Sequence, residues 1–201
     1  AALSSHSTPS STASPGTARK DCPVGTSVIR GRSKGCHELT ARTGTTGSFA
    51  YPRRMDDSCF IAGCGYTGLR LARRLRPRWR VTALARSAGT AESLAAEGIV
   101  PVRADLDEAP PSALLASSVD GAALAWLVPP PETGTSDPRL ARFLAAIGTA
   151  RPAMLLYVST TGVYGDTGGA TVTEETAVAP GNDRARRRVA AEAFAQAWSA
   201  A

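Results

Sequence analysis

Residues 58–75 read SCFIAGCGYTGLRLARRL, and this stretch decides the fold. The apolar run at 59–62 predicts a short buried strand, and Gly63-Cys64-Gly65-Tyr66-Thr67-Gly68 follows it at once as a complete G-x-G-x-x-G. Beyond the glycines, apolar residues recur with helical spacing on one face and arginines occupy the other face. The stretch therefore predicts a strand, a glycine turn and a helix, in that order.

Each glycine of the turn has a physical reason. Gly63 permits the tight turn, Gly65 lets a pyrophosphate approach the backbone, and Gly68 lets the helix pack against the strand. The free N–H groups at the helix start attract phosphate charge. An ordinary glycine-rich turn is the alternative, but the strand before it and the helix after it favour dinucleotide binding. We expect Gly63, Gly65, Tyr66, Thr67 and Gly68 to contact the cofactor.

The net charge of +6 is unevenly distributed over the 201 residues. Residues 1–54 hold six Arg and two Lys against two acids, whereas residues 55–201 balance 15 Arg with 15 acids. We therefore predict no nucleic-acid partner for residues 55–201, and a nucleic-acid binder acting through the basic tail is the least favoured function. We also predict no membrane partner, because no apolar run approaches the ~20 residues of a spanning helix.

Two segments are expected, residues 1–54 and residues 55–201. The first is rich in Ser, Thr, Gly, Pro and Arg, and we expect it to be disordered. It could be a transit peptide, a native flexible arm, or sequence read upstream of a true start at Met55, and we favour the last. Residues 55–201 are expected to form one nucleotide-binding domain.

Residues 55–201 contain no His and no Lys. A His-based triad, a Schiff-base lysine and a His-ligated metal site are therefore excluded there, and we predict no metal. Cys59 and Cys64 flank the first strand without forming a disulfide framework. A reduced, cytoplasmic location fits best, with an organelle as the alternative if residues 1–54 are a transit peptide.

Strands and helices alternate after the glycine turn. We expect strands at 80–85, 99–104, 122–128 and 154–159, and helices at 90–97, 110–117, 137–149 and 183–200. On the last helix we expect an apolar stripe of Ala190, Phe194, Ala197 and Trp198. Near-continuous apolar strands alternating with helices predict an α/β fold, a Rossmann-like parallel sheet flanked by helices on both faces.

Residues that follow the strands should face a ligand, because ligands of open α/β sheets bind beyond the carboxyl ends of the strands. Arg86 ends the second strand, 18 residues after Gly68, where an acid would indicate NAD. A guanidinium suits a 2′-phosphate, so we predict NADP, with NAD or a surface arginine as the alternative. Asp105 ends the third strand, beside the expected adenine position, or is a loop acid.

A further run, Ser159-Thr160-Thr161-Gly162-Val163-Tyr164-Gly165-Asp166, follows the fifth strand. With the glycine turn and the Asp105-Leu106 pair, it resembles the extended short-chain dehydrogenase/reductases, the NAD-dependent epimerase/dehydratase group, and within them an atypical branch. The resemblance spans residues 59–198. It implies that Thr160 is catalytic and binds a substrate oxygen, that Asp105 contacts adenine and that Leu106 packs on its ring.

The chain departs from that group at the acid/base pair Tyr-x-x-x-Lys. The pair falls on Arg184 and Arg188, and neither a Tyr after Tyr164 nor any Lys after residue 54 exists. Arg184 cannot pass a proton as tyrosine does, so Tyr164 or a water would have to donate it. Arg188 could hold the cofactor as a fixed cation, or these arginines could be a solvated face.

Members of the group continue into a C-terminal substrate domain, so we expect a fold that is truncated at its C-terminal side. The stripe on the last helix would then face the remaining sheet or a partner, for which a homodimer is one candidate. The leading function is that of an NAD(P)-dependent reductase, epimerase or dehydratase acting on a small hydroxylated substrate, with nucleotide-sugars among the candidates. The alternative is a non-catalytic NADP(H)-binding sensor or scaffold module.

Overall fold

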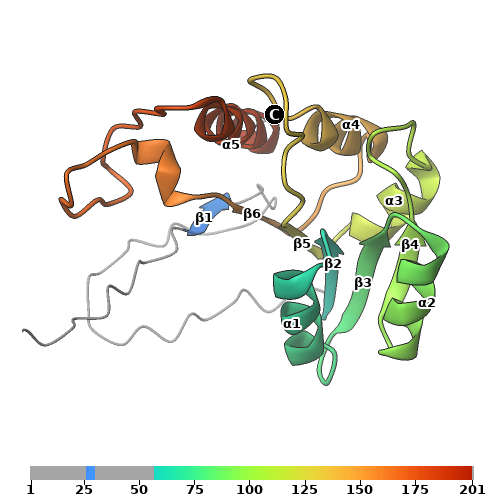
Figure 1. Cartoon of the computed structure of the whole chain (residues 1–201). Helices are drawn as coiled ribbons and strands as arrows, with labels where there is room; N and C mark the ends of the chain where they lie inside the picture. The colour runs from blue at the N-terminus through green and yellow to red at the C-terminus, as the bar shows by residue number, and fades with distance from the viewer. Residues whose placement is uncertain (1–25, 30–56, 201) are drawn as a thin grey trace, which may run out of the picture.

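The computed structural model describes residues 26–29 and 57–200 (Figure 1). The strands are β1 (Thr26–Ile29), β2 (Ser58–Ala62), β3 (Arg80–Ala85), β4 (Val100–Arg103), β5 (Ala123–Trp126) and β6 (Met154–Val158). The helices are α1 (Tyr66–Leu75), α2 (Ala88–Ala96), α3 (Ser112–Val119), α4 (Pro138–Ala146) and α5 (Asp183–Ala200), with a 3₁₀ turn η1 at Thr161–Tyr164.

The strands form one sheet in the order β1-β6-β5-β2-β3-β4. β2 pairs in parallel with β3 on one side and with β5 on the other, so the strand of residues 58–62 is central. Chain order reverses at β2, because β3 and β4 extend to one side of it and β5 and β6 to the other. In a sheet of this kind the crevice at the reversal is where a ligand binds.

Side-chain alternation along the strands divides the core between the two faces of the sheet. Cys59 and Ile61 pack with α1 and α2, whereas Phe60 and Ala62 pack with α3, α4 and α5. Successive side chains of a strand point to opposite faces, so an apolar run such as that of β2 buries both. The helices accordingly cover the sheet from two sides (Figure 1).

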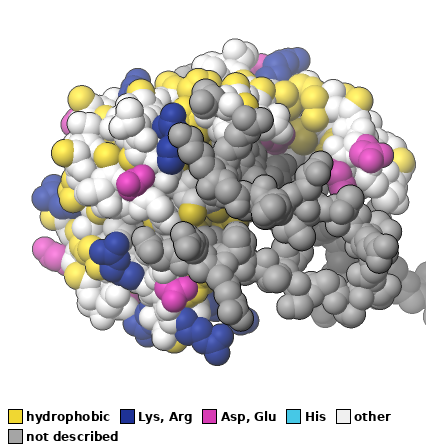
Figure 2. Space-filling model, turned by 180° about the vertical axis from the view of Figure 1, so that it is seen from behind, with side chains coloured by type: hydrophobic (Ala, Val, Ile, Leu, Met, Phe, Trp, Pro, Cys, Tyr) yellow, Lys and Arg dark blue, Asp and Glu magenta, His cyan; other side chains and the backbone are white. Residues whose placement is uncertain are grey.

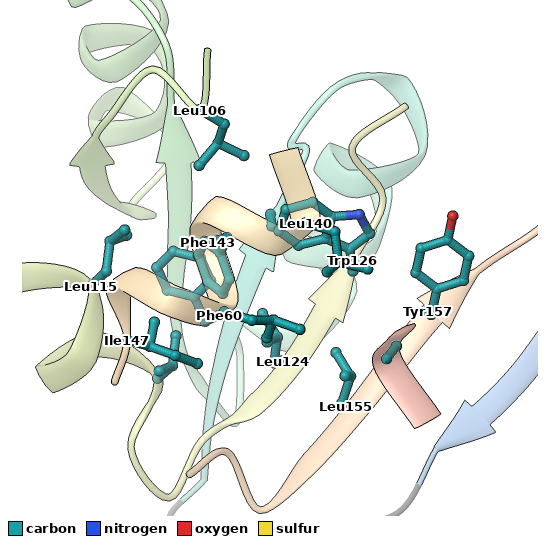
Figure 3. Packing of buried hydrophobic residues seen from close by; sticks show 14 of the residues in the cluster. Phe60, Leu106, Leu115, Leu124, Trp126, Leu140, Phe143, Ile147, Leu155 and Tyr157 are labelled. Atoms are coloured by element: carbon teal, nitrogen blue, oxygen red, sulfur yellow. The ribbon is translucent and has the colours of Figure 1, made fainter. Parts of the chain in front are cut away.

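Aromatic residues fill the larger of these two clusters. The ring of Phe143 on α4 lies 5.7 Å from that of Phe60 and 5.1 Å from that of Trp126, and none of the three is exposed. Figure 3 shows them between the aliphatic residues of α3, α4 and β5, with Tyr157 at the margin. This packing fixes α4 against the sheet and thereby sets where its first turn lies.

Most predicted elements are confirmed, and one expectation needs correction. On α5 the residues that pack into the core are Ala191 and Ala195 with part of Trp198, whereas Phe194 is 42% exposed and Ala197 is also exposed. The predicted stripe was wrong because several faces of this alanine-rich helix offer apolar residues at helical spacing, and contact with the sheet selects among them.

Of residues 1–54, only β1 lies within the described residues. These four residues form a strand antiparallel to β6. Three of the four are β-branched and suit a strand, and the outer edge of β6 offers them backbone partners. The expectation for residues 1–25 and 30–54 lies outside the described residues.

Phe143→Ala should lower the free energy of unfolding by about 3–5 kcal/mol, because it opens a cavity at the contact with Phe60 and Trp126. Urea denaturation followed by circular dichroism measures the loss. Phe194→Ala is the matched control, since that ring is partly exposed, and it should cost less than about 1 kcal/mol. Equal losses would contradict the packing described for α4.

Candidate functional site

A cavity of about 640 Å³ lies along the carboxyl ends of the parallel strands. Its lining comes from the turn after β2 and the first residues of α1, from residues at or after the ends of β3, β4, β5 and β6, and from single residues of α2, α4 and α5. The lining comprises Gly63, Cys64, Gly65, Tyr66, Thr67, Gly68, Leu84, Arg86, Thr90, Ala104, Asp105, Leu106, Asp107, Leu127, Val128, Pro129, Arg139, Val158, Ser159 and Arg188. The cavity therefore occupies the crevice at which chain order reverses.

The glycine turn shapes one wall of this cavity. Gly63 has φ +94°, and a Cβ there would lie 2.7 Å from the backbone of Leu127 and Val128. A Cβ on Gly68 would lie 2.5 Å from the carbonyl oxygen of Gly63, so α1 packs directly on the turn. A Cβ on Gly65 would meet nothing within 4 Å. Two glycines are thus required by close packing, and the third keeps a hollow free of side-chain atoms.

The start of α1 opens on that hollow. Its first intrahelical hydrogen bond runs from the N–H of Leu69 to the carbonyl oxygen of Gly65. The N–H groups of residues 66–68 therefore have no acceptor within the helix. The first turn has no side-chain cap and no acidic residue. Tyr66 is 76% exposed, with the guanidinium of Arg70 3.6 Å from its ring centre. An anion in the hollow would meet backbone donors and the positive end of the helix dipole.

Charged pairs mark the end of the cavity beside β3 and β4. Arg86 and Asp105 form an exposed ion pair, with Nε 3.6 Å from Oδ2. Asp105 also accepts a hydrogen bond from the backbone N–H of Asp107 at 2.9 Å. The Asp107 carboxylate takes two hydrogen bonds from Arg139 of α4, at 2.8 and 2.6 Å. This bidentate pair holds the pKa of Asp107 below its ordinary value and ties the loop after β4 to α4.

α4 is held in place from its first residue. Asp137 caps it, with Oδ1 accepting hydrogen bonds from the N–H groups of Arg139 and Leu140. Burial raises the pKa of the Asp137 carboxyl, against these hydrogen bonds and the charges of Arg188 and Arg139. Arg142 further along α4 donates to the carbonyl of Leu106 at 2.9 Å. The helix therefore places Arg139 at the cavity through several independent contacts.

Several hydrogen-bonded polar side chains lie at the end of the cavity beside β6. The Ser159 hydroxyl donates a hydrogen bond to the Glu192 carboxylate of α5. Arg188, one turn before Glu192, donates to the hydroxyl of Tyr157 and the carbonyl of Val158, both at 3.1 Å. Burial raises the pKa of Tyr157, although the positive charge of Arg188 opposes this shift. In Figure 3 the Tyr157 oxygen points away from the apolar cluster.

All nine residues that the sequence predicts to bind a cofactor lie in the lining. They are Gly63, Gly65, Tyr66, Thr67, Gly68, Arg86, Asp105, Leu106 and Arg188. The two predicted catalytic residues, Thr160 and Tyr164, lie beyond its edge, at the cap of η1 and within η1. The Thr160 oxygen accepts a hydrogen bond from the N–H of Gly162 at 3.3 Å. Arg184 is exposed and lies outside the lining.

Sequence reasoning missed three residues of this region. Ser159 lies in the lining in place of its neighbour Thr160, and Arg139 reaches the cavity from the helix expected at residues 137–149. Arg187, in the same run of arginines as Arg184 and Arg188, is 6% exposed and donates to the carbonyl of Gly134 at 2.7 Å. The position of Ser159 directly after a strand could have indicated its place in the lining, whereas the two arginines carry no signal in the sequence.

The crevice, the glycine turn and the strand order decide the architecture. The fold is a Rossmann-like α/β fold. No protein-family model matches the chain, and no curated protein matches it. Solved structures do match, among them a functionally unknown conserved protein from Silicibacter pomeroyi DSS, at 35% identity and a TM-score of 0.56. That alignment covers 70% of this chain and 49% of the other.

Two further structures extend the comparison. A "putative NAD-dependent epimerase/dehydratase" from Methylobacillus flagellatus is 30% identical with a TM-score of 0.55, covering 71% of this chain and 51% of that one. UDP-glucuronic acid 4-epimerase from Bacillus cereus, a variant complexed with NAD and UDP-4-deoxy-4-fluoro-glucuronic acid, is 17% identical with a TM-score of 0.56 and shares the fold alone. Its alignment covers 70% of this chain and 52% of that one. The chain spans about half the length of these structures.

Two observations concern the surface. Among residues 26–29 and 57–200, none of the helices is both long enough and apolar enough to span a bilayer. Figure 2 shows arginine and acidic side chains mixed over the described part of one face. This mixture agrees with the balance of 15 Arg and 15 acids in residues 55–201.

Gly63→Ala should lower the free energy of unfolding by about 2–3 kcal/mol, because it combines a positive φ with contact on the β5 backbone. Gly65→Ala is the matched control and should change stability by less than about 1 kcal/mol, since its Cβ enters open space. Thermal and urea unfolding of both variants measure the difference. A Gly63 variant as stable as the wild type would contradict the geometry of the turn.

Proposed function

We propose that the cavity binds NADP(H), or NAD(H), and that the chain is an epimerase, dehydratase or reductase of the NAD-dependent epimerase/dehydratase group. The proposal rests mainly on the hollow at Gly65, which no side chain fills and which faces the N–H groups at the start of α1 that have no intrahelical acceptor. A diphosphate fits this hollow because it needs backbone donors and close approach, and both are present. The similarity to the Methylobacillus flagellatus protein supports the same group.

The residues around the hollow suit the rest of a dinucleotide. Arg86 and Asp105 would bind the adenosine half, with the guanidinium on a 2′-phosphate, which favours NADP. Leu106 is 4% exposed, so only the part of its side chain that lines the cavity would contact the adenine ring. Arg188 and Ser159 lie at the other end, where a nicotinamide would supply hydride chemistry to a small hydroxylated substrate. Nucleotide-sugars are one class of such substrates.

A second candidate is a module that binds NADP(H) without turnover, as a sensor or a scaffold. It is favoured by the positions of Thr160 and Tyr164 outside the lining and by arginines at both positions of the expected acid/base pair. The free thiols of Cys59 and Cys64 favour a reducing, cytoplasmic location for either candidate. A homodimer through the exposed ring of Phe194 also remains a proposal.

Isothermal titration of the 201-residue chain with NADPH and with NADH tests the cofactor. Arg86→Gln should raise the Kd for NADPH about 10- to 100-fold, the loss of a charge-assisted contact, and change the Kd for NADH less than about threefold. Arg103→Gln is the matched control, because this exposed arginine at the end of β4 lies outside the lining. No heat with either cofactor would refute the proposal, and equal effects of Arg86→Gln on both would refute the 2′-phosphate contact.

Cysteine labelling gives an independent test, because Cys64 lies in the lining and Cys59 in the core. Burial raises the pKa of the Cys59 thiol to about 12 and also raises that of Cys64, so both are mostly protonated at pH 8. Iodoacetamide should label Cys64 slowly, and saturating NADPH should slow it at least about fivefold, as read by peptide mass spectrometry. Cys59 is the internal control and should stay unlabelled. Unchanged labelling of Cys64 would place the cofactor elsewhere.

A further inference from the structure

Ser159 and Glu192 form a hydrogen-bonded pair that connects the cavity to a carboxylate. Ser159 follows β6 and lies in the lining, while Glu192 projects from α5 and accepts the hydrogen bond of the Ser159 hydroxyl. Both residues are half-buried. The pair therefore links the wall of the cavity at Ser159 to α5.

The direction of this hydrogen bond leaves Ser159 able to accept another. A serine hydroxyl carries one hydrogen and two lone pairs, and here the hydrogen is directed at Glu192. A hydroxyl bound in the cavity can donate to the free lone pair of Ser159 while Ser159 donates to Glu192. Two consecutive hydrogen bonds would then lead from a ligand oxygen to a carboxylate.

The other ionisable groups near this end of the cavity are engaged or unsuited. The guanidinium of Arg188 has only donor atoms and donates to the Tyr157 hydroxyl and the Val158 carbonyl. Tyr157 is fully buried, lies outside the lining, and has its pKa raised by burial. Asp137, whose charge reaches both Tyr157 and Arg188, caps α4. At the far end, the carboxylates of the lining are paired with Arg86 and Arg139.

We propose that Ser159 and Glu192 carry the proton of the redox step, in place of the absent Tyr-x-x-x-Lys pair. This inference rests on the proposed function. In the oxidation of an alcohol, the substrate O–H proton passes to Ser159 Oγ as the Ser159 proton passes to the Glu192 carboxylate. The C–H hydride leaves with its electron pair to the oxidised nicotinamide, and a carbonyl forms. Ser159 is the catalytic residue, and Glu192 is a positioning residue that acts through it and keeps the proton.

Glu192→Gln separates the proton role from a structural role, because the amide oxygen can still accept the Ser159 hydrogen bond but cannot take up a proton at neutral pH. The full chain is assayed with butane-2,3-diol as probe and with whichever of NADP⁺ or NAD⁺ binds more tightly. The variant should lower kcat at least about 100-fold, the ordinary contribution of general acid–base catalysis. KM for the diol, the Kd for the cofactor by titration and the melting temperature should stay close to wild type, within about threefold for the two constants.

Ser159→Ala should reproduce this pattern, and Glu175→Gln, which removes an exposed carboxylate, should leave all constants unchanged. A Glu192→Gln variant that keeps kcat within threefold would overturn the proton path. Parallel losses of kcat, cofactor affinity and melting temperature would also overturn it, in favour of a structural role. Wild-type protein that binds the cofactor but does not oxidise the diol refutes the inference and favours the sensor, whereas absent cofactor binding refutes the proposed function itself.

Discussion

The close approach of two backbones, at Gly63 and at the exit of β5, is the constraint on which the rest of this structure depends. The N–H of Leu127 donates to the carbonyl of Ala62 at 2.7 Å, so β5 continues alongside the chain until the glycine turn begins. No side chain fits between Gly63 and the backbone of Leu127 and Val128. Because the two segments separate only beyond this point, the crevice opens directly at the start of α1. A bulkier turn would move α1 away from the strand ends and close the hollow at Gly65.

The helices of the opposite face give the two ends of the crevice different chemistry. α4 is fixed by the packing of Phe143 and by its Asp137 cap, and it places Arg139 beside the loop after β4. α5 is fixed by small residues against the core, and it places Arg188 and Glu192 beside the end of β6. Arginine–carboxylate pairs therefore characterise one end, and a serine–glutamate pair characterises the other.

The elements with strong local patterns were predictable. The bounds of β3 and α5 were predicted to the residue. The face of α5 was not predictable in this way. Phe194 has the greater apolar area, yet Ala191 and Ala195 are buried, since small residues allow the helix to lie close to its neighbours. The position of α3, which begins two residues later than predicted, and the turn η1 were also set by contacts that local patterns do not contain.

For the site, the sequence by itself determined the glycine turn and the strand-end residues Arg86 and Asp105, because chain connectivity alone brings carboxyl ends of parallel strands to one edge. It could not rank Ser159 against Thr160, since one residue of difference at a strand end decides which hydroxyl faces the crevice and which caps the following turn. Arg139 and Glu192 join the site from helices far along the chain, and only the packing of those helices on the sheet brings them there. The tertiary structure thus decided which polar groups meet, because side-chain encounters between distant segments depend on packing distances that no local pattern encodes.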